Sequence, residues 1–282
     1  MKKLIKVSLI IAAILIPLGI IFVVVGTMMG GKGFSISTDG KLNFFNEQSF
    51  EYENYDLEAF ENIDVEAYNG RVIIKASKDD TYGINVKLDS APKEPDIKVE
   101  NGILKVKEYE YNSWLSFNFG WFNTERYIEI YVPKDVLDSV NIDTSNGRIE
   151  LSGISLNELT VKTSNGKIEM TDLKADKCDV KTSNGAIAII ESEIENSRFV
   201  TSNGKISLEG TFQDVYAKTS NGSIDVSSDI SEEYYKISAK TSNGSVRIDG
   251  DKVSDEYTSR NSGEGYMELK TSNGSINMSF KK

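Results

Sequence analysis

Five lysines recur at one position of a repeated segment and together could bind an anionic ligand. Each stands one residue before a threonine that opens the tetrapeptide Thr-Ser-Asn-Gly: Lys162, Lys181, Lys218, Lys240 and Lys270. Stacked repeats would bring these like charges together, and a ligand with repeating negative charge would relieve their repulsion. An anionic cell-wall polymer such as a teichoic acid has this property. The alternative is a solvated face that keeps the strands soluble, with three acidic neighbours as neutralising partners: Glu150, Glu169 and Asp225.

An aromatic segment is the second candidate for binding. Residues 109–122 read YEYNSWLSFNFGWF and hold both tryptophans of the chain, Trp114 and Trp121. Such side chains could stack on a sugar, contact a membrane interface or dock a partner. Alternatively, they cover one end of the fold, because the terminal repeats of a stacked architecture must be capped.

The composition excludes much of enzyme chemistry. The sequence has no histidine, which removes Ser-His-Asp and Cys-His catalysis and histidine-ligated metals. Cys178 is the only cysteine and aligns with Leu159 of the preceding repeat, so we interpret it as a small core residue. A formal net charge of −11 argues against nucleic-acid binding. We therefore expect no catalytic residues, no cofactor, no metal and no nucleic acid.

The repeat predicts the secondary-structure elements that position the lysines. Thr-Ser-Asn-Gly occurs seven times, at intervals of 18 to 30 residues, and apolar residues alternate on both sides of each copy. This pattern predicts two strands per repeat, each with one buried face. The repeat threonines are Thr144, Thr163, Thr182, Thr201, Thr219, Thr241 and Thr271.

Asn-Gly between alternating strands is also typical of β-hairpins, so periodicity alone leaves two folds open. A hairpin gives no reason for Thr and Ser before every Asn-Gly. Parallel coils stacked in register do, because they place each residue beside the same residue of the next repeat. We therefore predict an all-β, single-domain parallel β-solenoid, with glycine at a corner where a side chain would clash or φ is positive. Counting two residues on from Thr puts the asparagines inside, as a buried structural ladder: Asn146, Asn165, Asn184, Asn203, Asn221, Asn243 and Asn273.

Residues 7–29 contain no charged residue, which predicts a transmembrane signal anchor. Lysines precede this run, so the positive-inside rule places residues 1–6 in the cytoplasm and the following domain outside the cell membrane. Residues 30–57 are expected to be a tether, and 58–282 the extracytoplasmic β-strand-repeat domain, with the Thr-Ser-Asn-Gly repeats in 142–282. Asn69-Gly70 and Asn101-Gly102 extend the pattern upstream in weaker form.

Three segments in this order, FENIDVEAYNGRVIIK, NGILKVKEY and YIEIYVPKD, followed by repeated SNG units, resemble the toast-rack domain family over residues 58–282. This adhesin-like, β-strand-repeat family has a largely unassigned function and includes LiaG-like proteins that are encoded with envelope-stress systems. The resemblance implies an extracytoplasmic β-solenoid in a Gram-positive-type envelope, and it brings no catalytic residues.

Two classes of function remain. The first is a membrane-anchored binding or scaffold protein of the bacterial cell envelope, linked to envelope stress or adhesion, whose partner is an anionic cell-wall polymer or an envelope membrane protein. The second is an enzyme acting on acidic polysaccharide, which rests only on an analogy with other β-helices.

Overall fold

A computed structural model describes residues 2–28, 33–37, 42–44, 49–89, 93–109, 113–118, 126–135 and 137–282. The chain divides into two compact units. Unit 1 comprises Met1–Ser49, Asp89–Pro92 and Glu110–Glu125, and unit 2 comprises Phe50–Leu88, Lys93–Tyr109 and Arg126–Lys282.

Unit 1 contains the helix α1 (Lys2–Met28), with Pro17 inside it, and a small antiparallel sheet. A search of the described residues finds no helix that meets the length and hydropathy expected of a membrane span. The strands of the sheet pair in the order β2-β1-β9, with the bounds β1 (Gly33–Ser37), β2 (Leu42–Phe44) and β9 (Ser113–Asn118). Residues 30–57, expected to be a tether, thus include β1, β2 and a further strand, β3 (Ser49–Asn54).

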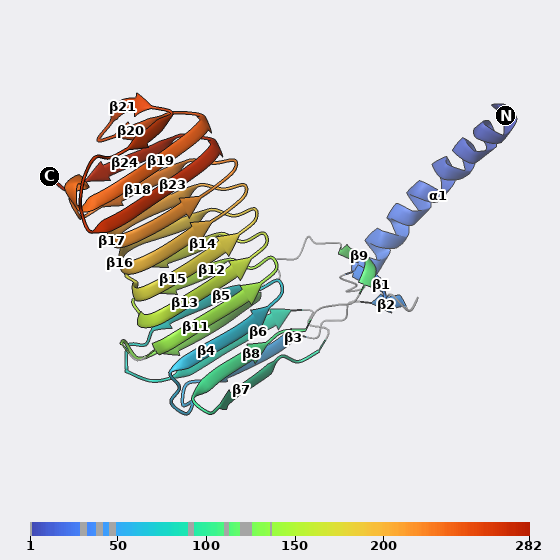
Figure 1. Ribbon diagram of the computed structural model, residues 1–282. Coiled ribbons are helices and arrows are strands. Elements are labelled where there is room, and N and C mark those ends of the chain that lie inside the picture. The colour runs from blue at the N-terminus through green and yellow to red at the C-terminus, as the bar shows by residue number, and fades with distance from the viewer. Residues whose placement is uncertain are drawn as a thin grey trace. The chain divides into compact units, whose positions relative to one another are not determined.

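Unit 2 is built, within the described residues, on one large mixed sheet that winds into stacked coils (Figure 1). One side of each coil contributes to a parallel layer that we call wall A, in the spatial order β8 (Ile103–Lys107), β4 (Asn62–Ala67), β11 (Leu137–Thr144), β13 (Ser155–Thr163), β15 (Lys174–Thr182), the second half of β16 (Ile187–Val200), the second half of β17 (Ile206–Lys218), β23 (Gly265–Asn273) and β19 (Tyr235–Asn243).

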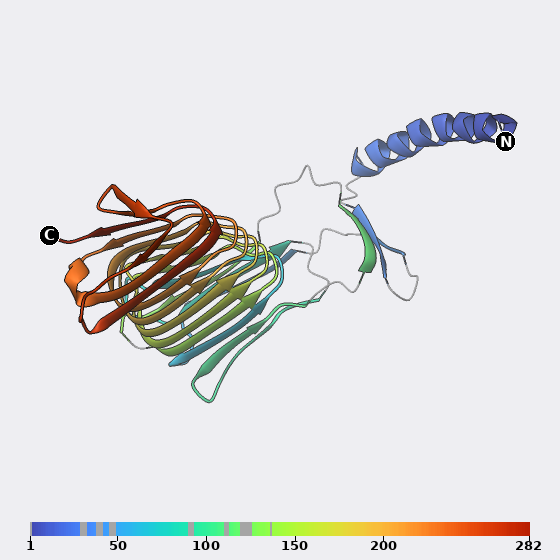
Figure 2. The same cartoon turned by 45° about the horizontal axis from the view of Figure 1, so that its top comes forward.

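The other side of each coil forms wall B, and Figure 2 shows the successive coils lying over one another. Its strands are parallel except for β6, which is antiparallel to β10. The order is β6 (Gly83–Asp89), β10 (Arg126–Val132), β5 (Arg71–Ala76), β12 (Ile149–Ser152), β14 (Ile168–Thr171), the first halves of β16 and β17, β18 (Ile224–Ser228), β24 (Ile276–Phe280) and β20 (Val246–Ile248).

Shorter elements complete unit 2. β7 (Asp96–Glu100) is antiparallel to β8, and β3 pairs with β6. β22 (Glu256–Thr258) and β21 (Asp251–Ser254) are antiparallel to β19 and β20, and a 3-10 turn, η1, covers Glu232–Tyr234. The apolar residues that alternate along both walls are buried, including Val161, Ile168 and Cys178.

The parallel pairing that the sequence predicts for the Thr-Ser-Asn-Gly repeats is confirmed by the register. Thr163 pairs with Thr144 on one side and with Thr182 on the other. Equivalent residues of successive repeats therefore lie beside each other on neighbouring coils. One arrangement departs from chain order: β23 lies between β17 and β19, and β24 lies between β18 and β20. The latest strands of the sequence therefore form an interior coil, which the sequence did not predict.

The four residues of the repeat make the corner between wall A and wall B. Each threonine is buried, and every hydroxyl except that of Thr144 donates to a glycine carbonyl of the neighbouring coil, for example Thr201 Oγ1 to Gly185 O at 2.9 Å. Thr144 donates to Tyr68 O instead. The glycine is required by close approach, because a Cβ on Gly185 would lie 1.8 Å from Gly166 O. Of the two reasons for glycine that the sequence allowed, the clash is the one that applies here.

The asparagines form a continuous ladder, but the prediction that they point inward is wrong. From Asn146 onward each side-chain amide donates to the one before it at 2.7–2.8 Å, in the row Asn69, Asn146, Asn165, Asn184, Asn203, Asn221, Asn273 and Asn243. All of the seven repeat asparagines are exposed. The inward-outward alternation of a strand ends at the threonine, where the chain turns, so counting by two across the corner placed Asn on the wrong face.

The second upstream Asn-Gly pair behaves differently from the first. Asn101 and Gly102 have positive φ angles of 53° and 73° and connect β7 to β8, where Glu100 pairs with Ile103. This is the two-residue hairpin that Asn-Gly typically makes. The same dipeptide thus serves as a hairpin turn at residue 101 and as a coil corner at residue 69.

These two environments predict different rates of deamidation when the full chain is aged. Deamidation requires the side-chain amide of Asn to reach the next backbone N–H. Asn184 is held by Asn165 and Asn203 at 2.7 and 2.8 Å. Two hydrogen bonds of about 1 kcal/mol each should slow its conversion about tenfold or more relative to Asn101. Peptide mapping by mass spectrometry measures both sites in one sample, and equal rates would show that the ladder does not hold its amides.

Candidate functional site

The outer face of wall A brings the five predicted lysines into one row, here called the lysine column. Its members follow each other on adjacent strands in the order Lys162, Lys181, Val200, Lys218, Lys270 and Lys240. Because neighbouring strands are about 4.8 Å apart, the column extends over about 24 Å. All of these lysines are exposed except Lys270, which is half-buried.

The members of the column differ in their partners. Lys240 Nζ lies 2.9 Å from Glu256 Oε2, and Lys270 forms an ion pair with Glu268. Lys162, Lys181 and Lys218 have no ion pair with any residue in the described part of the chain. At the other end the column becomes acidic, since Asp143 pairs in register with Lys162 and Glu66 with Asp143. Positive charge is therefore concentrated from β13 onward.

The basic residues just past the corner, on wall B, are neutralised by acidic neighbours. Arg148 lies 2.7 Å from Glu150 and 2.9 Å from Glu169, and Lys167 also pairs with Glu169. Lys167 is the main cause of the lowered pKa of Glu169. Lys205 lies 2.5 Å from Asp225. The neutralising partners expected from the sequence thus act on wall B and leave three lysines of wall A unpaired within the described residues.

The aromatic segment is described only in part. Trp114 lies on β9, whose side chains are not among those described, and Trp121 lies outside the described residues. β9 pairs with β1 in unit 1 and not with the large sheet. Whether this segment binds a ligand or caps the coil stack stays a prediction, because its side chains lie outside those described.

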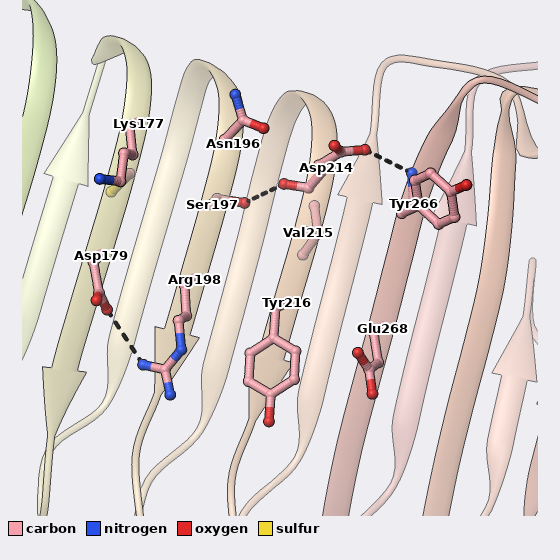
Figure 3. Close-up of a pocket in the computed structure, with 11 residues that line it drawn as sticks. Lys177, Asp179, Asn196, Ser197, Arg198, Asp214, Val215, Tyr216, Tyr266 and Glu268 are labelled. Carbon is pink, nitrogen blue, oxygen red and sulfur yellow. Dashed lines mark hydrogen bonds and ion pairs between the residues drawn. The ribbon is translucent and has the colours of Figure 1, made fainter.

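A shallow hollow of about 370 Å³ lies beside the lysine column on the outer face of wall A (Figure 3). It spans β15, β16, β17 and β23. The side chains around it are Lys177, Asp179, Asn196, Arg198, Asp214, Tyr216, Tyr266 and Glu268. Sequence reasoning missed this site because Tyr266 comes 50 residues after Tyr216 and reaches it only through the interior position of β23.

The polar groups of the hollow are held in place. Asp179 Oδ1 accepts a hydrogen bond from Arg198 Nη1 at 3.3 Å, and the guanidinium carbon of Arg198 lies 5.4 Å from the centre of the Tyr216 ring. Asp214 Oδ1 accepts from the backbone N–H of Tyr266 at 2.8 Å. Figure 3 shows these groups on adjacent strands of one face. Fixed donors and acceptors beside the exposed ring of Tyr266 are suited to binding a polar ligand.

A buried ion pair lies at a different place in unit 2. Arg126 Nη2 donates to Glu108 Oε1, and the side chains of Arg126 and Glu108 are only 16% and 2% exposed. Glu108 Oε2 also accepts from the backbone N–H of Tyr68 at 2.7 Å. Glu108 and Arg126 flank the segment Glu110–Glu125 of unit 1. The pair therefore fixes the points where the chain leaves and re-enters unit 2.

Metal and thiol chemistry have no visible basis among the described residues. Within them, no group of three or more Cys, Asp or Glu side chains could hold a metal ion. Cys178 is buried, and burial raises the pKa of its thiol well above the ordinary value. A thiol in this state is a poor nucleophile.

The family follows from a comparison with family models. The model described as Toastrack DUF4097 matches residues 60–275, which is most of the chain and covers both walls of unit 2. The chain belongs to the Toastrack DUF4097 family. The toast-rack resemblance of the sequence is thereby confirmed.

Several solved structures are similar to this Toastrack chain at low sequence identity. A "putative adhesin" from Bacteroides fragilis NCTC 9343 is 13% identical with a TM-score of 0.49, covering 84% of this chain and 99% of that one. A "putative lipid binding protein" from Parabacteroides distasonis ATCC 8503 is 14% identical, with a TM-score of 0.45 and coverages of 84% and 98%. A "putative cell adhesion protein" from Clostridium sporogenes ATCC 15579 is 16% identical, with a TM-score of 0.41 and coverages of 83% and 100%.

The three structural relatives are named as adhesion or binding proteins and not as enzymes. No protein of curated function matches the chain. The family match therefore leaves the function of this Toastrack chain to be argued from its own surface.

Proposed function

We propose that this Toastrack protein is a non-catalytic, membrane-anchored binding protein of the bacterial cell envelope. In this proposal unit 2 is a parallel β-solenoid outside the cell, and its ligand is an anionic polymer that lies along the lysine column. The anchor rests on the uncharged run at residues 7–29 and on the lysines before it. Exposed apolar side chains on α1, among them Leu9, Ile14 and Phe22, agree with it.

The lysine column supports the proposal through its spacing. Lys162 and Lys181 are neighbours across one inter-strand distance of about 4.8 Å. This is shorter than the Debye length of about 8 Å at physiological ionic strength, so salt does not fully screen their repulsion. A polymer with regularly spaced negative charges would lower this electrostatic energy, whereas one small anion could neutralise only part of the column.

No specific observation favours an enzyme acting on acidic polysaccharide. Such an enzyme needs basic groups available to the substrate. In the hollow, Arg198 is already hydrogen-bonded to Asp179 and lies over Tyr216. The arrangement is therefore better suited to holding a ligand than to activating one.

The proposal predicts weaker and less salt-sensitive binding when the unpaired lysines are removed. We would immobilise poly(glycerol phosphate) and measure retention of the full chain with Lys162→Gln, Lys181→Gln and Lys218→Gln combined. Exposed charge contacts contribute about 0.2–1 kcal/mol each, so the affinity should fall about tenfold. The salt dependence should become flatter, because fewer charges take part.

A matched control removes the same charge from wall B. Arg148→Gln, Lys167→Gln and Lys205→Gln together delete three positive charges that already have acidic partners. This variant should bind almost as well as the wild-type chain. If both triple variants lose affinity equally, then only net charge matters and the lysine column is a solvated face. Unchanged retention of the wall A variant would lead to the same conclusion.

A further inference from the structure

The hollow on wall A carries two aromatic rings among charged and polar side chains. The residues aligned with Tyr216 on neighbouring strands are Arg198 and Glu268, and those aligned with Tyr266 are Asp214 and Lys236. Tyr216 and Tyr266 are thus diagonal neighbours on β17 and β23. Tyr266 is 55% exposed. Two tyrosine rings and several hydrogen-bonding groups thus lie beside one cavity.

We propose that this hollow is a subsite for a single uncharged sugar ring of an envelope glycan. Its volume of about 370 Å³ falls within the range of small-ligand sites, about 300–1,000 Å³. The face of a tyrosine can cover the C–H face of a sugar, and planar carboxylate, amide and guanidinium groups can pair with neighbouring hydroxyls, which both donate and accept. Lys236 Nζ lies 4.8 Å from the centre of the Tyr266 ring. The Tyr266 ring and the side chains of Asn196, Arg198 and Asp214, which line the hollow, supply these groups.

Charge decides between a sugar and a bare polyanion in the hollow. Two basic residues line it, Lys177 and Arg198, against three acidic ones, Asp179, Asp214 and Glu268. A phosphate or carboxylate would therefore meet a slightly negative surface there. The unpaired positive charge lies two residues further along the same strands, at Lys181 and Lys218, which is about 7 Å away. The two surfaces are thus adjacent but chemically distinct.

The sugar subsite refines the proposed function, and its role in binding an envelope polymer rests on that proposal. A polymer whose anionic groups follow the lysine column could place a sugar substituent in the hollow. Because Asp214 uses only one carboxylate oxygen on the Tyr266 N–H, the other oxygen can accept from a hydroxyl. The lysine column would then supply general attraction to a polyanion, and the hollow would select chains that carry sugars.

Two forms of one polymer separate these roles. We would measure binding of the full chain to bare poly(glycerol phosphate) and to the same polymer carrying glucosyl substituents. The wild-type chain should bind the glucosylated form about tenfold more tightly, since one aromatic contact and one or two hydrogen bonds are gained. Tyr266→Ala and Asn196→Ala should each reduce this preference and leave binding of the bare polymer unchanged.

The control is Tyr55→Ala, which removes another exposed ring of unit 2, 46% exposed. It should keep the preference. A second measurement is independent of the polymer: saturation-transfer NMR with the methyl glycosides of glucose, galactose and N-acetylglucosamine should detect binding that Tyr266→Ala abolishes. If bare polymer does not bind but a glycoside does, the proposed function fails and the subsite stands. No preference for the glucosylated polymer, together with no transfer to any glycoside, would overturn the subsite.

Discussion

Replacing Gly185 by alanine is expected to destabilise the protein by about 3–5 kcal/mol. The new Cβ would lie 1.8 Å from Gly166 O and 2.6 Å from the carbonyl carbon of Gly166. Both atoms belong to the backbone of the neighbouring coil, so the clash cannot be relieved by rotating a side chain. The coils must separate at the corner, which weakens the Asn184–Asn165 and Thr201–Gly185 hydrogen bonds as well. The midpoint of denaturant unfolding of the full chain measures this loss.

Two controls separate the clash from other effects of substitution. Ser183→Ala changes an exposed residue at the same corner and should alter stability by less than about 0.5 kcal/mol. Gly250→Ala tests backbone conformation alone, because Gly250 has a φ of 93° with nothing within 4 Å of the new Cβ. It should cost about 1 kcal/mol. If Gly185→Ala costs no more than Gly250→Ala, the close approach of the coils is not what fixes glycine in the repeat.

The second large effect is expected at the buried ion pair. Glu108→Gln removes the buried carboxylate that pairs with Arg126, in a site where both side chains are mostly buried. Breaking such a pair costs about 3–5 kcal/mol. Adding Arg126→Gln to the same chain should recover part of the loss, because no buried charge then remains. Thermal unfolding of the two variants and the wild-type chain measures both steps.

An exposed pair provides the matched control for this substitution. Glu158 Oε1 lies 2.6 Å from Lys177 Nζ, with the two side chains 52% and 63% exposed. Glu158→Gln makes the same chemical change and should cost less than about 1 kcal/mol. Equal losses at Glu108 and Glu158 would mean that burial does not strengthen the first pair.

The repeat itself carried enough information to predict the parallel coils, because hydroxyl and amide side chains that recur before glycine have a physical role only when copies stack. The lysine column followed from the same argument, since its members are strand residues beside Thr and keep the alternation. The asparagines were placed on the wrong face, because alternation holds along a strand and fails at a corner. Neither the hollow nor the Glu108–Arg126 pair could be predicted, since each joins residues that are close only through the winding of the chain.

The same Asn-Gly dipeptide lies in two different structures in this chain, which sets another limit on prediction from sequence. Asn69-Gly70 enters the ladder because β4 and β5 belong to stacked coils, whereas Asn101-Gly102 connects the antiparallel strands β7 and β8. The flanking residues alternate in both cases. What distinguishes them is the presence of a copy above or below, and this is a property of the whole fold and not of the local sequence.

The interior position of β23 and β24 has a consequence for how the molecule is made. A simple linear array can grow from its first coil, each new coil settling on the previous one as it emerges. Here the coil of β19 and β20 emerges before the coil on which it rests. Until β23 and β24 arrive, β17 and β18 present open parallel edges, which are the kind of surface that recruits other chains. Folding of unit 2 therefore includes a late step in which β23 and β24 pair between coils that precede them in the chain, and synthesis that stops before residue 265 would leave the edges of β17 and β18 unpaired.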